Sequence, residues 1–205
     1  MATAYKNKIY TGKNITWNQL IQDNTGLTTR TVNGITYTNN KDGTFTVSGI
    51  ATTVSTCIVG KFTNLDSSHK YLYCGTPYGG AGNTYSMRVY ASGVGQSVAS
   101  DLGEGAVITG TSANEMRVVI AGTNKDFGIL TFTPQLFDLT LMFGAGNEPA
   151  TATEFWSHFD RKYYPYNTGE SQPLFLISRK RKIKSGDATL ISYKKGGINE
   201  WQKLQ

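Results

Sequence analysis

The sequence predicts an all-β protein, a jelly-roll-like β-sandwich with one short C-terminal helix and extended arms at both ends. Three observations support this fold class. The chain of 205 residues is rich in Gly (23), Tyr (12) and Thr, which suits short strands joined by turns. Runs with strand character recur between loops of Gly, Ser, Asn and Asp, as in sandwiches and jelly rolls. Only one segment, residues 151–160, has a clear helix start.

The charge divides the chain into parts. Residues 174–205 contain eight Lys and Arg against two acidic residues and so carry the whole formal net charge of +6, whereas residues 1–173 contain twelve of each sign. We therefore expect three parts: an arm over residues 1–23, a sandwich over 24–168 and a basic tail over 169–205. The arm has no hydrophobic signal core and the chain no run of 18 apolar residues, so we expect synthesis in a cytoplasm and no membrane insertion.

The first strands form the clearest hairpin. Asn33-Gly34 is the dipeptide preferred in two-residue hairpin turns, and the apolar residues of 35–38 alternate with Thr. A second turn follows over residues 39–43, and 45–48 alternate again on the return strand. Further strands are expected at 57–62, 70–74, 85–90, 115–121 and 129–133, the last ending at Pro134 because proline cannot donate to the ladder. The apolar run 136–143 is interpreted as a buried strand.

The last element is a helix over residues 151–160. Gly144 and Gly146 admit backbone angles closed to other residues, and Asn147 tolerates them, so a sharp turn should precede the helix. Thr151 and Glu154 have the spacing of a capping box. The aromatic residues that follow lie on one helical face and should dock on the sandwich: Phe155, Trp156 and Phe159.

Residues with catalytic or metal-binding chemistry are few, so we expect no enzyme, metal or cofactor. His69 and His158 have no partner at a ligand spacing, and no nucleophile, zinc or P-loop motif occurs. Calcium held by Asp101 and Glu104 has no supporting ligand spacing. The carboxylates of Asp138, Glu148 and Glu154 are expected to cap a helix or bond to turns, not to form a glycosidase pair. Cys57 and Cys74 are expected to stay reduced.

Two groups of residues are candidates for binding. Tyr and Asn side chains can stack on sugar rings and bond to their hydroxyls, and such groups occur at Tyr78, Asn83, Tyr85 and Tyr90. The alternative for each tyrosine is ordinary sheet packing. A basic run could attach the chain to an acidic protein surface; nucleic acid is less expected because no stacking platform accompanies it. This run comprises Arg179, Lys180, Arg181, Lys182 and Lys184.

One segment resembles a known family. It contains Pro134-Gln-Leu-Phe-Asp-Leu-Thr140, then Phe143-Gly-Ala-Gly-Asn-Glu-Pro149, then Glu154-Phe155 and Tyr163-Tyr-Pro-Tyr-Asn167. We call residues 134–167 the signature segment. It is similar to a block in bacteriophage tail, baseplate, fibre and head-decoration proteins, and the resemblance extends over about residues 17–168. Its structural residues would be Phe143, Gly144, Gly146, Asn147, Pro149, Thr151, Glu154 and Trp156.

The resemblance implies a small β-sandwich similar to carbohydrate-binding modules, in a non-enzymatic virion protein. It implies other capsid or tail subunits as partners, a homo-oligomer such as a trimer, and a possible host surface glycan as ligand. A glycan-binding module of a prophage-derived bacterial protein is the alternative, and a polysaccharide-degrading enzyme the third interpretation.

Overall fold

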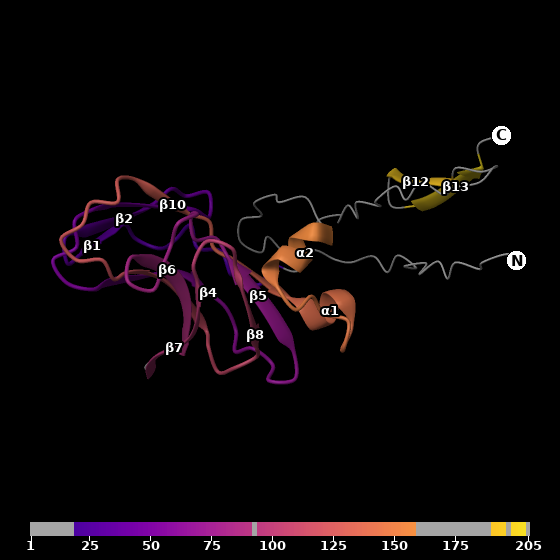
Figure 1. Ribbon diagram of the computed structural model, residues 1–205, viewed down its shortest axis with the longest axis horizontal. Helices are drawn as coiled ribbons and strands as arrows, with labels where there is room; N and C mark the ends of the chain where they lie inside the picture. Colours follow the sequence, from indigo (N-terminus) through magenta and orange to yellow (C-terminus); the bar gives the residue numbers. More distant parts are fainter. Residues whose placement is uncertain (1–18, 92–93, 159–189, 196–197, 204–205) are drawn as a thin grey trace, which may run out of the picture.

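The computed structural model describes residues 19–91, 94–158, 190–195 and 198–203 (Figure 1). Strands dominate this part, all pairs are antiparallel, and the two helices are short, which confirms the all-β, sandwich-like fold class. The first sheet has the order β1 (Arg30–Val32), β2 (Ile35–Asn39), β3 (Phe45–Gly49), β10 (Leu130–Phe132). The second has the order β11 (Gln135–Asp138), β5 (Lys70–Cys74), β8 (Ala106–Thr109). The third has the order β4 (Ser55–Lys61), β9 (Glu115–Ile120), β6 (Tyr85–Ala91), β7 (Val94–Asp101).

The predicted hairpins are confirmed. Asn33 (φ 48°) and Gly34 (φ 84°) form the two-residue turn between β1 and β2, in which Val32 pairs with Ile35. Both residues have the positive φ that this turn requires. The second turn joins β2 to β3 with Asn39 opposite Phe45, and Gly43 (φ 91°) supplies a positive φ there.

One apolar core joins the three sheets. Alternate residues of the strands face it, which is the two-residue period of a strand buried on one side. Tyr37 is fully buried in this core, and its hydroxyl donates a 2.8 Å hydrogen bond to Ser55 Oγ. The largest core residues from each sheet include Phe45 and Phe132, Tyr73 and Leu136, and Met87, Met116 and Ile120.

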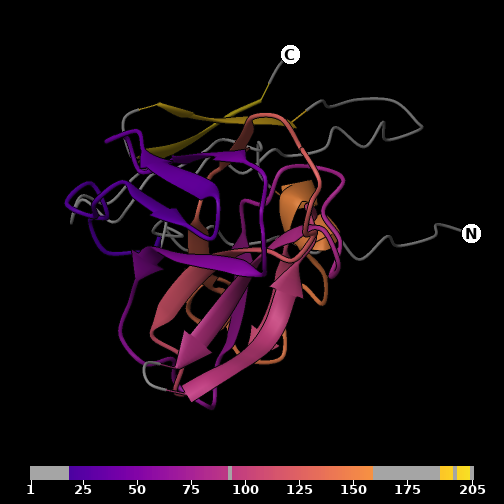
Figure 2. The ribbon, with the colours of Figure 1, turned by 90° about the vertical axis from the view of Figure 1, so that its left-hand side faces the viewer.

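The β11-β5-β8 sheet is buried on both faces. Tyr73 and Leu136 face the shared core, whereas Leu72 and Phe137 belong to a second apolar cluster on the opposite face. The helices α1 (Leu139–Phe143) and α2 (Ala152–His158) cover that face. Figure 1 shows both helices beside β5, and in Figure 2 they lie behind the strands that face the viewer. Burial on both faces explains why β5 and β11 have apolar runs in place of alternation.

The interpretation of residues 136–143 as one strand is wrong. The strand β11 ends at Asp138, and the rest of the run forms the helix α1, which places Leu141 in solvent (67% exposed). Asp138 is the helix N-cap, because its Oδ1 accepts a 2.8 Å hydrogen bond from the N–H of Leu141. This carboxylate satisfies a backbone donor that the first turn leaves free.

The predicted arm overlaps the sandwich. Gln19 forms a β-bridge with Phe137, and the N–H of Leu20 donates to the carbonyl of Leu136 at 2.8 Å. Ile21 is fully buried against Gly60, where a side chain on the glycine would approach within 3.1 Å of Ile21 Cδ1. The folded part therefore begins by residue 19, not 24, and residues 1–18 lie outside the described residues.

The remaining strands complete the comparison with the sequence. Strand β5 has the predicted bounds, and β4, β6, β9 and β10 differ from prediction by one or two residues at their ends. Strands β7 and β8 were not predicted. In the basic tail, β12 (Leu190–Lys195) pairs with β13 (Ile198–Lys203), with Tyr193 opposite Glu200.

Candidate functional site

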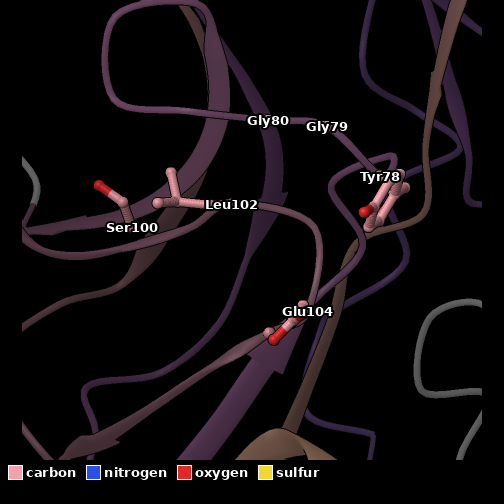
Figure 3. Close-up of a pocket in the computed structure, with 7 residues that line it drawn as sticks. Tyr78, Gly79, Gly80, Ser100, Leu102 and Glu104 are labelled. Atoms are coloured by element: carbon pink, nitrogen blue, oxygen red, sulfur yellow. The ribbon is translucent and has the colours of Figure 1, made fainter.

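An open pocket of about 470 Å³ lies between two loops of the sandwich. The first loop leaves β5 and the second leaves β7, and both are rich in glycine. Figure 3 shows Tyr78 on one side of the opening, Ser100 and Leu102 on the other, and the backbone of Gly79 and Gly80 along one rim. The lining residues are Tyr78, Gly79, Gly80, Ser100, Leu102, Glu104 and Gly105.

A buried carboxylate holds the two loops together. Asp101 is fully buried, and its Oδ2 accepts a 2.8 Å hydrogen bond from the N–H of Thr76 in the first loop. Its Oδ1 accepts from the N–H groups of Gly103 (2.9 Å) and Gly105 (2.8 Å) in the second loop. Thr76 Oγ1 donates in turn to the carbonyl of Asp101 at 2.9 Å. Hydrogen bonds to a charged group are stronger than neutral ones, so the pocket is built on ordered backbone.

Glycines let the loops approach each other closely. A Cβ on Gly80 would lie 2.9 Å from the carbonyl oxygen of Leu102, and one on Gly103 would lie 3.1 Å from the carbonyl oxygen of Pro77. Gly103 also has a φ of 118°, which disfavours any residue with a side chain. The packing of the two loops thus depends on close backbone contacts that larger residues would disrupt.

Tyr78 is the most exposed large apolar residue of the described chain. Its side chain is 89% exposed, while its carbonyl accepts a 2.9 Å hydrogen bond from the hydroxyl of Tyr85. The backbone is therefore anchored and the ring stays in solvent. The pocket thus combines an exposed aromatic ring on one side with the hydroxyl of Ser100 and the carboxylate of Glu104 elsewhere in its lining. A stacking face and hydrogen-bonding groups of this kind can bind a sugar.

The structure separates the four predicted glycan-binding residues. Tyr78 lines the pocket and Asn83 is exposed further along the same loop. Tyr85 is only 8% exposed and packs edge-on against Phe127 and Phe132. Tyr90 is 7% exposed, with the guanidinium of Arg117 at 4.8 Å from its ring centre. Neither buried ring offers a face to a ligand, so both follow the packing alternative.

Ser100, Leu102 and Glu104 were not predicted as glycan-binding residues from the sequence. Ser100 lies in β7, and Leu102 and Glu104 follow this strand, whose polar sequence did not predict a strand. The hydrogen bonds of Asp101 bring their loop to the loop of Tyr78. The signal that could have identified them is the spacing of Asp101, Gly103 and Gly105, in which one carboxylate bonds to two N–H groups beyond it.

A second polar cluster lies at the start of β5. His69 Nδ1 is 2.7 Å from Asp138 Oδ2, although the two residues are 69 positions apart. This hydrogen bond, above all, raises the pKa of His69 above its ordinary value of 6.5. Because the other oxygen of Asp138 caps α1, the pair joins β5 to the helix. His69 has no partner at a ligand spacing in the sequence, and its partner Asp138 meets it only because the fold brings two distant positions together.

The other carboxylates of the signature segment also bind locally, as expected. Glu148 Oε1 accepts a 2.8 Å hydrogen bond from Thr140 Oγ1, which itself accepts from the N–H of Lys70 at 2.9 Å. Thr151 Oγ1 accepts from the N–H of Glu154 at 3.1 Å, which confirms this half of the capping box. The Glu154 side chain accepts from the N–H of Ala150, one residue before the cap.

The remaining signature residues shape the turn and the helix contact. Gly144 (φ 89°) and Gly146 (φ 80°) adopt positive φ as predicted, whereas Asn147 does not, and its N–H closes the turn onto the carbonyl of Gly144. Pro149 is buried. Phe143 and Trp156 are half-buried against Phe155, with ring centres 6.1 and 4.9 Å from it. Phe159 lies outside the described residues.

The described residues include neither a cluster of metal ligands nor a disulfide. No three His, Cys, Asp or Glu side chains of the described residues gather where they could hold a metal ion. Both Asp101 oxygens already accept backbone hydrogen bonds, which argues against the calcium site considered with Glu104. Cys57 and Cys74 are buried in different apolar clusters and form no disulfide with each other. No helix within the described ranges is long and apolar enough to cross a bilayer.

The basic run Arg179–Lys184 and the end of the signature segment lie outside the described residues. Comparison with protein families, curated proteins and solved structures finds no match for this chain.

Proposed function

We propose that the chain is a non-enzymatic structural protein of a bacteriophage particle, a capsid or tail decoration or fibre component, and that its sandwich binds host surface glycans. The virion role rests on the resemblance of the signature segment. The glycan role rests on one observation, the exposed ring of Tyr78 above a pocket whose backbone is fixed by Asp101.

The order of the pocket supports binding. A ligand loses less affinity to the ordering of loops when those loops are already fixed, and here hydrogen bonds to Asp101 hold both. The pocket is open to solvent, which suits one end of a surface polysaccharide better than a small enclosed ligand.

The hydrogen bonds of the polar groups support a non-enzymatic role. A His–Asp pair can act as a general base in an enzyme. Here Asp138 also caps α1 with its second oxygen, so the pair has a structural purpose in joining β5 to the helix. Glu148 and Glu154 are likewise engaged at Thr140 and at the start of α2.

For assembly, we propose attachment to other virion subunits through the basic tail, as a homo-oligomer such as a trimer. The Lys and Arg side chains of residues 179–184 would meet an acidic subunit surface. The protein would be made in the host cytoplasm and reside in the virion, without cofactor, membrane insertion or bound nucleic acid.

Two experiments test this function. Mass spectrometry of purified particles should detect the chain, and its copy number would distinguish a capsid decoration from a tail component. A glycan array probed with the protein and with Tyr78→Ala should show binding that the substitution abolishes. Absence from particles, with glycan binding intact, would favour the alternative of a prophage-derived bacterial glycan-binding protein. Release of reducing sugar from host polysaccharide would favour the enzyme.

A further inference from the structure

The residues that line the pocket carry negative charge and no positive charge. Glu104 is the only charged residue among those that line it. Its side chain is exposed and forms no hydrogen bond or ion pair with any described residue, in contrast to Glu115, which holds Arg117 at 2.6 Å on the third sheet. The carboxylate is thus free to act on a ligand.

No cation in the lining offsets this charge. Arg88 contacts the same loop, but its guanidinium donates to the carbonyl of Gly82 (3.4 Å) and to Ser86 Oγ (3.2 Å) and does not line the pocket. A carboxylate only accepts hydrogen bonds, so Glu104 needs donors on the ligand. Sugar hydroxyls are donors, whereas a second carboxylate supplies none.

We propose that this pocket prefers uncharged sugars to acidic ones such as uronic and sialic acids, with Glu104 as the residue that sets the selectivity. The inference rests on the proposed glycan binding at Tyr78 and specifies its ligand class. Tyr78 would stack on the sugar ring, and Glu104 would accept from its hydroxyls.

The expected selectivity is modest because the site is open to water. Two like charges about 4 Å apart in water repel enough to weaken binding on the order of fivefold. Salt should reduce the effect, since exposed charges are screened. The selectivity should therefore be largest at low ionic strength.

The experiment uses the full-length protein at neutral pH and low salt, with two matched pairs of probes: methyl glucoside with its glucuronide, and methyl galactoside with its galacturonide. Chemical-shift titration by NMR gives the Kd for each. The wild type should bind the uncharged member of at least one pair roughly fivefold more tightly than the acidic one. Glu104→Gln should bring this ratio close to one.

A control removes a carboxylate elsewhere. Asp126→Asn, at an exposed turn where Oδ1 accepts only from the N–H of Gly128, should keep the wild-type ratio. Equal binding of acidic and uncharged probes, or a ratio that Glu104→Gln leaves unchanged, would overturn the selectivity while the glycan function stands. Failure of all four probes and of a glycan array to bind would overturn both.

Discussion

Asp101 shows how one side chain can organise a binding site that it does not line. Its carboxylate is completely buried with no cation beside it among the described residues, and backbone N–H groups from two loops satisfy it. A buried charge is costly unless it is hydrogen-bonded in this way. The residue is thus both a structural requirement and the reason that Tyr78 and Glu104 face one pocket.

Asp101→Ala should destabilise the protein by roughly 2–4 kcal/mol, because it leaves buried donors of Thr76, Gly103 and Gly105 without an acceptor. Urea unfolding measures the loss. Asp126→Ala, which removes an exposed carboxylate bonded to one N–H, should cost less than about 1 kcal/mol. Equal losses in the two variants would refute the role of Asp101.

His69 gives a pH-dependent contribution to stability. Its pKa is raised in the folded state, chiefly by the hydrogen bond to Asp138, so protonation favours folding. The contribution is complete below the ordinary pKa of 6.5 and is lost as pH rises through the higher pKa of the folded state. Urea midpoints across neutral pH should fall for the wild type and stay flatter for His69→Gln. A variant that keeps the wild-type slope would contradict this assignment.

The sequence correctly predicted that α2 docks on the sandwich through aromatic residues. These residues differ in how deeply they are buried. Phe155 is fully buried and stacks on Phe137, with ring centres 5.4 Å apart. Trp156 is half-buried and packs edge-on against the same ring at 6.3 Å. The helix is therefore held mainly by Phe155.

Phe155→Ala should lower the free energy of unfolding by about 3–5 kcal/mol, the usual cost of removing a large buried aromatic side chain. Trp156→Ala, its neighbour on the same helix, should cost about half as much because part of its surface already lies in solvent. The melting temperatures of the two variants test whether Phe155→Ala is the more destabilising substitution. A larger effect at Trp156 would show that the helix docks through a different face.

The elements also show what the sequence can and cannot predict. Asn33-Gly34 and the Thr151 cap are local chemistry, so their positions were predicted correctly. Residues 136–143 were misassigned because an apolar run is compatible with strand or helix, and Asp138 decides between them through a hydrogen bond. Strand β7 has a polar, glycine-containing sequence without alternation and gave no signal.

Only part of the candidate site could be predicted from the sequence, for a similar reason. Tyr78 stands out in a glycine-rich loop, and the sequence alone singled it out. Glu104 belongs to a loop 26 positions later, and its approach to Tyr78 depends on the long-range hydrogen bonds between Asp101 and Thr76. The local sequence pattern does not reveal such long-range contacts. The sequence therefore predicted Tyr85 and Tyr90 as glycan-binding residues and not Glu104.

At the scale of the whole molecule, the core and both helices lie within residues 19–158. Deleting residues 174–205 should therefore leave a soluble, folded sandwich with an unchanged melting temperature. The truncated chain should fail to enter particles, and attachment of the full-length chain should weaken with salt because the deleted segment carries the net positive charge. Particle assembly followed by mass spectrometry tests both points. Normal incorporation would transfer the anchoring role to residues 1–18.

The bridge between Gln19 and Phe137 also determines when the second sheet can close during synthesis of the chain. A ribosome exposes Gln19 long before it has made its partner, so the second sheet cannot close until Phe137 has left the exit tunnel. Nascent chains shorter than this should remain open to proteases, and refolding of the whole chain should take milliseconds to seconds, as is usual for β-proteins with distant pairings. The fold is thus completed after translation of the sandwich, not during it.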